Sequence, residues 1–157
     1  MRQEFAEVVV VGAPVEEAWR VVSDITTVLS WISIVEDVAV QEPGARYSAV
    51  LKDRLGPFKL RADLGISVSA DEAARRIEAR ADGEDRQIGS RLAVDVRLVV
   101  REEEGGAVID VSGAYEVTGR PASLGAASIR KKAQRILSEF FTSVGSGLDS
   151  PAEWAHR

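Results

Sequence analysis

The sequence SRLAVDVRLVV, residues 90–100, alternates apolar and polar side chains over most of its length. Successive side chains of a β-strand point to opposite faces of the sheet, so the alternation predicts one face against a core and one in water. Residues 58–68, FKLRADLGISV, repeat the pattern. Antiparallel sheets commonly keep one face solvated in this way. The apolar members of the first stretch are Leu92, Val94, Val96, Leu98 and Val100.

Other segments are also expected to be strands, because they are rich in β-branched residues or alternate similarly. The segments that separate them carry turn residues, such as EPG at 42–44, GP at 56–57 and DGE at 82–84. Such short connections favour hairpins, so we expect one antiparallel sheet. Its seven expected strands are residues 4–11, 35–41, 46–55, 58–69, 74–81, 90–100 and 108–118.

Two short helices are expected between the first and second strands. Pro14 marks the start of the first helix, because proline suits a first helical turn. Ser23 or Asp24 can cap the second helix, over residues 25–30. The apolar face of the first helix consists of Val15, Ala18, Trp19 and Val22.

A long C-terminal helix over residues 123–144 is expected to cover the dry face of the sheet. Ser123 is its expected N-cap and Gly145 its expected stop. Its apolar stripe has helical spacing and consists of Ile129, Ala133, Ile136, Leu137, Phe140, Phe141 and Val144. Its opposite face is basic and carries Arg130, Lys131, Lys132 and Arg135.

The bulk composition favours a single folded domain. The chain has 157 residues, of which 45% are hydrophobic and 29% charged. A net charge of -5 offers no basic surplus for a nucleic acid, so we expect no nucleic-acid partner. No cysteine occurs and the first residues do not form a signal peptide, so we expect a cytoplasmic protein. The expected domain is residues 1–145, followed by a polar tail at 146–157.

One helix cannot fill the concave side of seven twisted strands, so the space left is either plugged by large side chains or open to a ligand. Aromatic residues make up only 6% of the chain, too few to make a plugged interior the obvious solution. We therefore favour an apolar cavity. Trp31 is either a gate at its mouth or a packed boundary aromatic. The expected lining consists of Trp31, Ile32, Val35, Tyr47, Ala49, Leu51, Phe58, Leu60, Leu64, Ile66, Val94, Val96, Tyr115, Ile129, Ala133 and Phe140.

The sequence contains no recognisable catalytic motif. His156, the only histidine, falls in the expected tail, so a nucleophile would lack its usual base. With one histidine and no cysteine, a zinc or iron site would lack its ligands. The segment GRPASLG at 119–125 has neither the spacing nor the lysine of a phosphate-binding loop. We therefore expect no catalytic residues, no cofactor and no metal, and a non-enzymatic role is favoured.

Several motifs together resemble the CoxG family of carbon monoxide dehydrogenase subunits, a branch of the START-like superfamily that is related to polyketide cyclases. The motifs are APVEEAW at 13–19, LGPF at 55–58, YEVTGRPASLG at 115–125 and FF at 140–141. The resemblance extends over residues 5–144. One departure is WISIV at 31–35, where family members usually have a Cys-Ile-Pro-Gly-like stretch. The resemblance implies an α+β helix-grip fold, a curved seven-stranded antiparallel sheet wrapped around a long C-terminal helix.

The resemblance also implies a function. It indicates a carrier or accessory protein of a carbon monoxide dehydrogenase-type redox enzyme that binds a lipid-like or quinone-like molecule. The alternatives are a cyclase or aromatase-like enzyme, with Tyr47, Asp53 and Tyr115 as polar groups in the same cavity, and a protein-binding adaptor with a filled interior. The basic helix face is either simply solvated or a peripheral contact with anionic lipid or an acidic partner.

Overall fold

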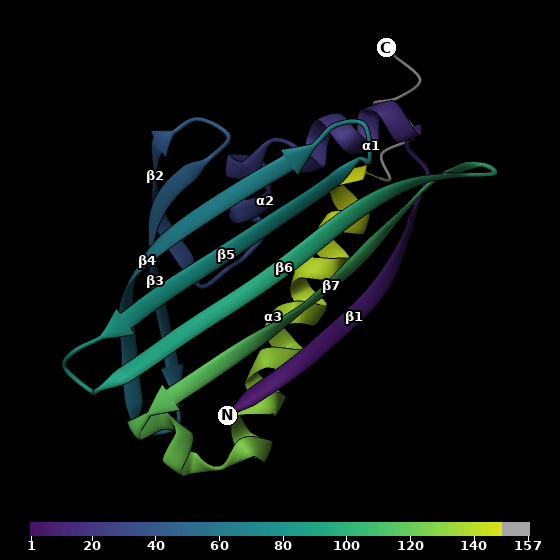
Figure 1. Cartoon of the computed structure of the whole chain (residues 1–157). Helices are drawn as coiled ribbons and strands as arrows, with labels where there is room; N and C mark the ends of the chain where they lie inside the picture. The colour runs from purple at the N-terminus through teal and green to yellow at the C-terminus, as the bar shows by residue number, and fades with distance from the viewer. Residues whose placement is uncertain (149–157) are drawn as a thin grey trace.

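The computed structural model describes residues 1–148, the side chains of residues 55, 123 and 124 excepted, and is built on one antiparallel sheet (Figure 1). The seven strands lie in the order β1-β7-β6-β5-β4-β3-β2. Neighbours from β2 to β7 are consecutive in sequence, as expected for hairpins. The strands are β1 (Arg2–Val11), β2 (Val35–Glu42), β3 (Arg46–Leu55), β4 (Phe58–Asp71), β5 (Arg76–Asp85), β6 (Ser90–Glu103) and β7 (Gly106–Gly119).

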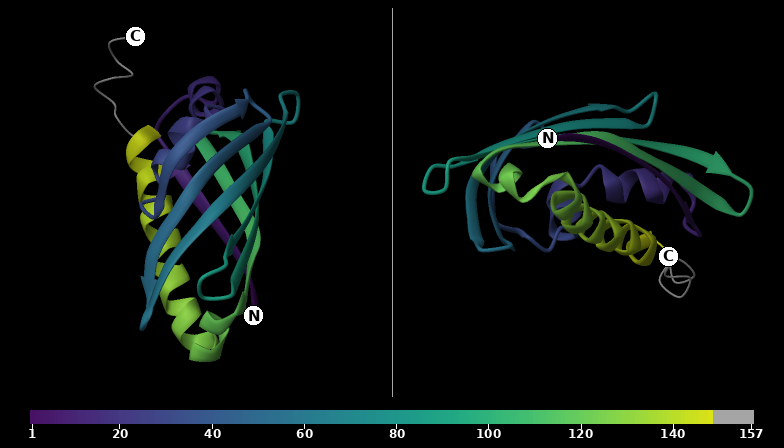
Figure 2. Two further views of the ribbon diagram at one scale, coloured as in Figure 1. Left: turned by 90° about the vertical axis from the view of Figure 1, so that its left-hand side faces the viewer. Right: turned by 90° about the horizontal axis from the view of Figure 1, so that it is seen from below.

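The helices lie on one side of this curved sheet. Figure 2 shows α3 running along the concave face, with α1 and α2 beside it. The backbone of α3 comes close to β1 at one edge of the sheet. The predicted fold, a curved seven-stranded sheet around a C-terminal helix with two short helices after the first strand, is confirmed. The helices are α1 (Val15–Val22), α2 (Ile25–Ser30), the short 3-10 helix η1 (Arg120–Leu124) and α3 (Ala126–Leu148).

The two faces of the sheet differ as the alternation predicts. On the concave face Leu98 and Val100 are 5% and 3% exposed, and burying each such side chain stabilises the fold by about 1.5–3 kcal/mol. On the convex face Arg80 of β5 pairs with Asp95 of β6, with 3.0 Å between Nη1 and Oδ1. An exposed pair of this kind contributes at most about 1 kcal/mol. Apolar burial therefore drives the fold, and the charge pairs keep the outer face polar.

One predicted turn is wrong. The DGE segment at 82–84 continues β5, in which Gly83 pairs with Leu64 on one side and Leu92 on the other. A Cβ on Gly83 would lie 2.5 Å from Cδ2 of Leu64, so this glycine permits close packing rather than a turn. The chain turns after Asp85 instead, and Gly89 there has a φ of 61° that favours glycine.

Both predicted ends of the long helix are wrong. Gly125, with a φ of 93°, separates η1 from α3, so α3 begins at Ala126 and Ser123 is not its N-cap. Gly145 does not stop the helix, which continues to Leu148. A glycine inside a helix costs about 1 kcal/mol, and the burial of Leu148 at 0% exposure offsets that cost. Residues 149–157, the rest of the expected tail with His156, lie outside the described residues.

Close packing at Gly113 of β7 can be tested by Gly113→Ala. A Cβ there would lie 2.0 Å from the backbone oxygen of Asp95 and 2.8 Å from Cζ of Phe5. We expect the free energy of unfolding, measured by urea titration, to fall by about 1–3 kcal/mol. The control is Gly65→Ala in β4, where no atom lies within 4 Å. A loss no larger at Gly113 than at Gly65 would contradict this packing.

Candidate functional site

The concave face of β3 and β4 is a continuous apolar wall. Tyr47, Ala49 and Leu51 alternate along β3 and are 6%, 4% and 7% exposed. They lie opposite Ile66, Leu64 and Ala62 of β4. The curvature of the sheet turns this wall toward α3 (Figure 2). The strand periodicity therefore identified which side chains face the helix.

The structure brings the predicted lining residues into two neighbouring apolar clusters. The larger cluster contains Trp31, Ile32, Val35, Tyr47, Ala49, Leu51, Leu64, Ile66, Val96 and Phe140. The smaller, called here the Tyr115 cluster, contains Val94, Tyr115, Ile129 and Ala133. Leu60 packs against both. Phe58 belongs to neither and is partly exposed at the start of β4.

The two clusters differ in how completely they are filled. In the larger one, α1 and α2 contribute side chains such as Ala18 and Val22, which are 0% and 1% exposed. In the Tyr115 cluster only Tyr115 and Ile129 are buried. The apolar side chains that pack on these two keep partial exposure, and they are Met1, Phe5, Leu60, Val94, Val117, Ala122 and Ala133. The concave face therefore carries accessible apolar surface at the Tyr115 cluster.

Four polar groups interrupt the concave apolar face. Nζ of Lys132 lies 3.0 Å from Oδ1 of Asp53. The Tyr47 hydroxyl accepts a hydrogen bond of 2.8 Å from the backbone N–H of Gly44. Burial raises the pKa of the Tyr115 hydroxyl, and the positive charge of Arg130 offsets part of this rise. Tyr115 is therefore protonated at neutral pH and can donate a hydrogen bond.

The basic face predicted on α3 needs one correction. Arg130, Lys131 and Arg135 are exposed, as expected. Lys132 is only 29% exposed at its side chain and is paired with Asp53. Helical spacing explains the difference, because position 132 is three residues after Ile129 and so lies at the border of the apolar stripe. The exposed basic face is therefore smaller than the sequence suggested.

The segment that contains Trp31 is docked on the second half of α3. The ring of Trp31 packs against Phe140 with 6.4 Å between centroids. Nearby, the Ser33 hydroxyl donates to Oε2 of Glu139 at 3.0 Å. Trp31 is thus a packed, partly exposed aromatic on the larger cluster. Sequence reasoning missed the role of Gly147, where a Cβ would lie 2.8 Å from Cζ2 of Trp31.

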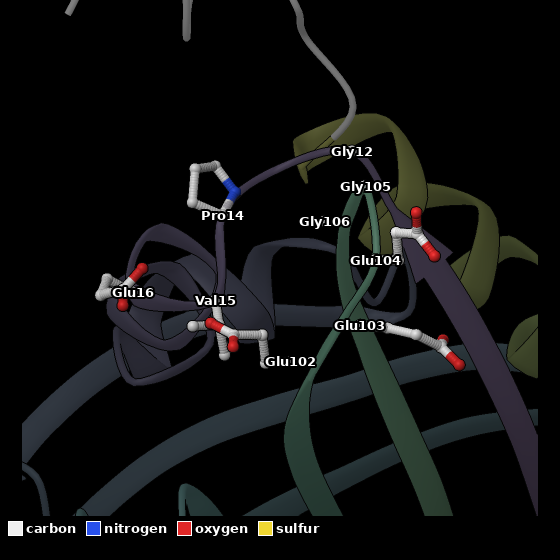
Figure 3. Close-up of a pocket in the computed structure, with 9 residues that line it drawn as sticks. All are labelled: Gly12, Pro14, Val15, Glu16, Glu102, Glu103, Glu104, Gly105 and Gly106. Carbon is white, nitrogen blue, oxygen red and sulfur yellow. The ribbon is translucent and has the colours of Figure 1, made fainter.

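The hollows found on the outer surface are separate from this interior. One, of about 480 Å³, lies between the start of α1 and the β6–β7 hairpin (Figure 3). Its glutamates point in different directions, and no group of acidic or histidine side chains within residues 1–148 is arranged to hold a metal ion. A second hollow, of about 560 Å³, lies over polar residues of β4 to β7 and shares only Val96 with the predicted lining. The described helices include none that is long and apolar enough to cross a membrane.

The contact between Trp31 and α3 can be tested with two helix glycines. Gly147→Ala should displace the Trp31 ring, which should shift its fluorescence to longer wavelength and lower the free energy of unfolding by about 1–2 kcal/mol. Gly145→Ala is the matched control, because its nearest atom is Val9 Cγ1 at 4.0 Å, and it should stabilise α3 by up to about 1 kcal/mol. Both are made with Trp19 and Trp154 replaced by Phe, so that Trp31 alone is observed. An unchanged spectrum for Gly147→Ala would contradict the contact.

Comparisons with known structures show what the fold is similar to. A conserved protein from Geobacillus kaustophilus superposes with a TM-score of 0.73 at 16% identity, over 94% of this chain and 95% of that one. A START superfamily protein from Mycobacterium smegmatis gives 0.69 at 13%, over 92% and 96%. The aromatase/cyclase Zhui from Streptomyces sp. R1128 gives 0.69 at 12%, over 94% of each chain. At these identities the likeness establishes the START-like fold alone.

Sequence comparison identifies the branch of this fold. A search of curated proteins gave no match. The family model for CoxG, a carbon monoxide dehydrogenase subunit, matches residues 8–148, from β1 to the end of α3. The match includes β3, β4, β6, β7 and α3, which carry most of the predicted lining. The protein therefore belongs to the CoxG family of carbon monoxide dehydrogenase subunits.

Proposed function

We propose that this protein binds a small apolar molecule between the sheet and the first half of α3, at the Tyr115 cluster. The observation that carries the proposal is the partial exposure of apolar side chains between sheet and helix, such as Leu60 and Val94 of the sheet and Ala133 of α3. Covering accessible apolar surface with a ligand gains about 25 cal/mol per Å². The concave face thus has apolar surface that the chain leaves accessible, and burying that surface stabilises a bound ligand.

Family membership supports a more specific proposal. The matching family is described as a subunit of carbon monoxide dehydrogenase, so we propose a carrier or accessory role beside a redox enzyme of this type. Lipid-like or quinone-like molecules are the proposed ligands, because they are largely apolar and carry a small polar group. The concave face offers the same combination, an apolar wall with a few polar groups.

A cyclase-like enzyme is the alternative, and it has less support from the polar groups. Asp53 is held by Lys132, and the Tyr47 hydroxyl is bonded to the backbone of Gly44. Asp53 would have to give up Lys132 to take a proton at Oδ1, whereas the Tyr47 hydroxyl only accepts from Gly44 and keeps its own proton. The raised pKa of Tyr115 makes its hydroxyl a weak acid that holds its proton at neutral pH. The site is therefore better suited to binding than to acid–base chemistry.

Ligand binding can be tested with extraction and a fluorescent reporter. Organic extracts of the purified protein, analysed by mass spectrometry, should contain an apolar small molecule. Emptied protein should bind N-phenyl-1-naphthylamine, a neutral apolar dye. Ala133→Phe should fill the Tyr115 cluster and weaken dye binding by at least about tenfold. Ala127→Phe is the control, because Ala127 is exposed on α3. Empty extracts together with no dye binding by the wild type would contradict the proposal.

We also propose that the exposed bases of α3 contact an anionic membrane surface. In Figure 1 the start of α3 and the β3–β4 hairpin lie at the same end of the molecule. This hairpin adds the exposed side chains of Arg54 and Lys59 to Arg130 and Lys131. The glutamates of the β6–β7 hairpin lie at the other end, so the molecule has a basic and an acidic end. A negative surface would attract the basic end.

Charge reversal tests the membrane contact. Lys131→Glu with Arg135→Glu should weaken binding to vesicles containing phosphatidylserine by at least about tenfold, because each surface base near anionic lipid contributes about 1 kcal/mol. The control is Arg46→Glu at the start of β3, beside the β2–β3 hairpin, which in Figure 1 lies at the end away from the start of α3. Vesicles of phosphatidylcholine alone should bind neither the wild type nor the double variant. Equal binding of the double variant and the wild type to phosphatidylserine would show that these bases are only solvated.

A further inference from the structure

A charged pair joins an inward position of β3, where the strand pattern calls for an apolar side chain, to the border of the apolar stripe of α3. Along β3 the inward positions are Tyr47, Ala49, Leu51 and then Asp53. On α3, Lys132 lies one turn after Ile129 of the apolar stripe. The two charged side chains meet across the concave face with 3.0 Å between Nζ and Oδ1. Positions where a local rule is broken are often functional.

The pair is unusual for this molecule in its burial. The side chain of Asp53 is 14% exposed, whereas every other carboxylate in an ion pair of residues 1–148 is at least 30% exposed. Taking two charges out of water costs as much as their attraction returns, and well-packed apolar residues of similar size commonly serve stability as well. Fold stability therefore gives no reason for a charged pair at this place.

The pair borders the accessible apolar surface. Asp53 lies opposite Leu60 in the β3–β4 ladder, and Leu60 packs on the Tyr115 cluster. Lys132 directly precedes Ala133 and follows Ile129 by three residues, and both of these residues belong to that cluster. A lysine ammonium has three N–H donors, and the contact with Oδ1 of Asp53 occupies one of them. Donors are therefore present at the edge of an apolar surface.

We propose that the Asp53–Lys132 pair is the polar end of the ligand site and selects apolar molecules that carry a neutral carbonyl group. The inference rests on the proposed function. Lys132 donates a hydrogen bond to the carbonyl oxygen, while Asp53 neutralises the ammonium and disfavours an anionic head group beside it. Tyr115, protonated at neutral pH, supplies a second donor in the same cluster. An alkane of equal length would leave these donors without an acceptor.

Competition against bound N-phenyl-1-naphthylamine tests the selection. The competitors are 2-tetradecanone, tetradecane and tetradecanoate, which share one chain length. In the wild type the ketone should displace the dye about tenfold better than the alkane, as expected for a hydrogen bond from a charged donor. Lys132→Met should remove this preference, measured relative to the dye affinity of the variant itself. Asp53→Asn should improve competition by tetradecanoate about tenfold, because the ammonium is then unneutralised.

Lys131→Met is the matched control, because Lys131 is the exposed neighbour of Lys132. It should keep the preference of the wild type for the ketone. Urea unfolding confirms that each variant is folded before it is titrated. Retention of the ketone preference in Lys132→Met overturns the inference while dye binding upholds the proposed function. Failure of the wild type to bind the dye or any competitor overturns the proposed function itself.

Discussion

The pairing of β1 with β7 decides how the concave face is covered. The two strands pair over ten residues, from Arg2 opposite Glu116 to Val11 opposite Ala107. This pairing places β1 and β2, which are consecutive in sequence, at opposite edges of the sheet. The chain between them must pass across the concave face, and it does so as α1 and α2 (Figure 2). These helices fill one end of the face, whereas the other end has α3 as its main cover.

This unequal covering explains why the interior divides into two clusters. Side chains from α1, α2 and α3 meet the sheet in the larger cluster, which contains most of the buried apolar side chains. At the Tyr115 cluster α3 supplies Ile129 and Ala133, one large and one small side chain. Because the backbone of α3 approaches the sheet chiefly at β1, the half formed by β3 and β4 is reached by long side chains. Lys132, which extends to Asp53, is one of them.

Charge is used in two distinct ways in this molecule. On the convex face, cross-strand pairs such as Arg80–Asp95 are half-exposed, and water screens them. They therefore contribute little to the stability of the fold and mainly keep this face polar. On the concave side, Asp53–Lys132 is the least exposed ion pair of the described residues, so water screens it less and its energy depends more on its surroundings. A ligand that enters beside it changes those surroundings. An interior charge pair can therefore favour one class of apolar molecule over another, which a purely apolar wall cannot do.

The sequence by itself determined the strands, the single covered face and the inward side chains of β3, because strand periodicity of two is set by local backbone geometry. It also determined the apolar stripe of α3 and the family. It did not determine that Gly83 continues a strand or that α3 passes Gly145, because contacts with distant residues decide both. Only the tertiary structure decided that Lys132 turns inward, because the carboxylate that holds it, Asp53, is 79 residues away.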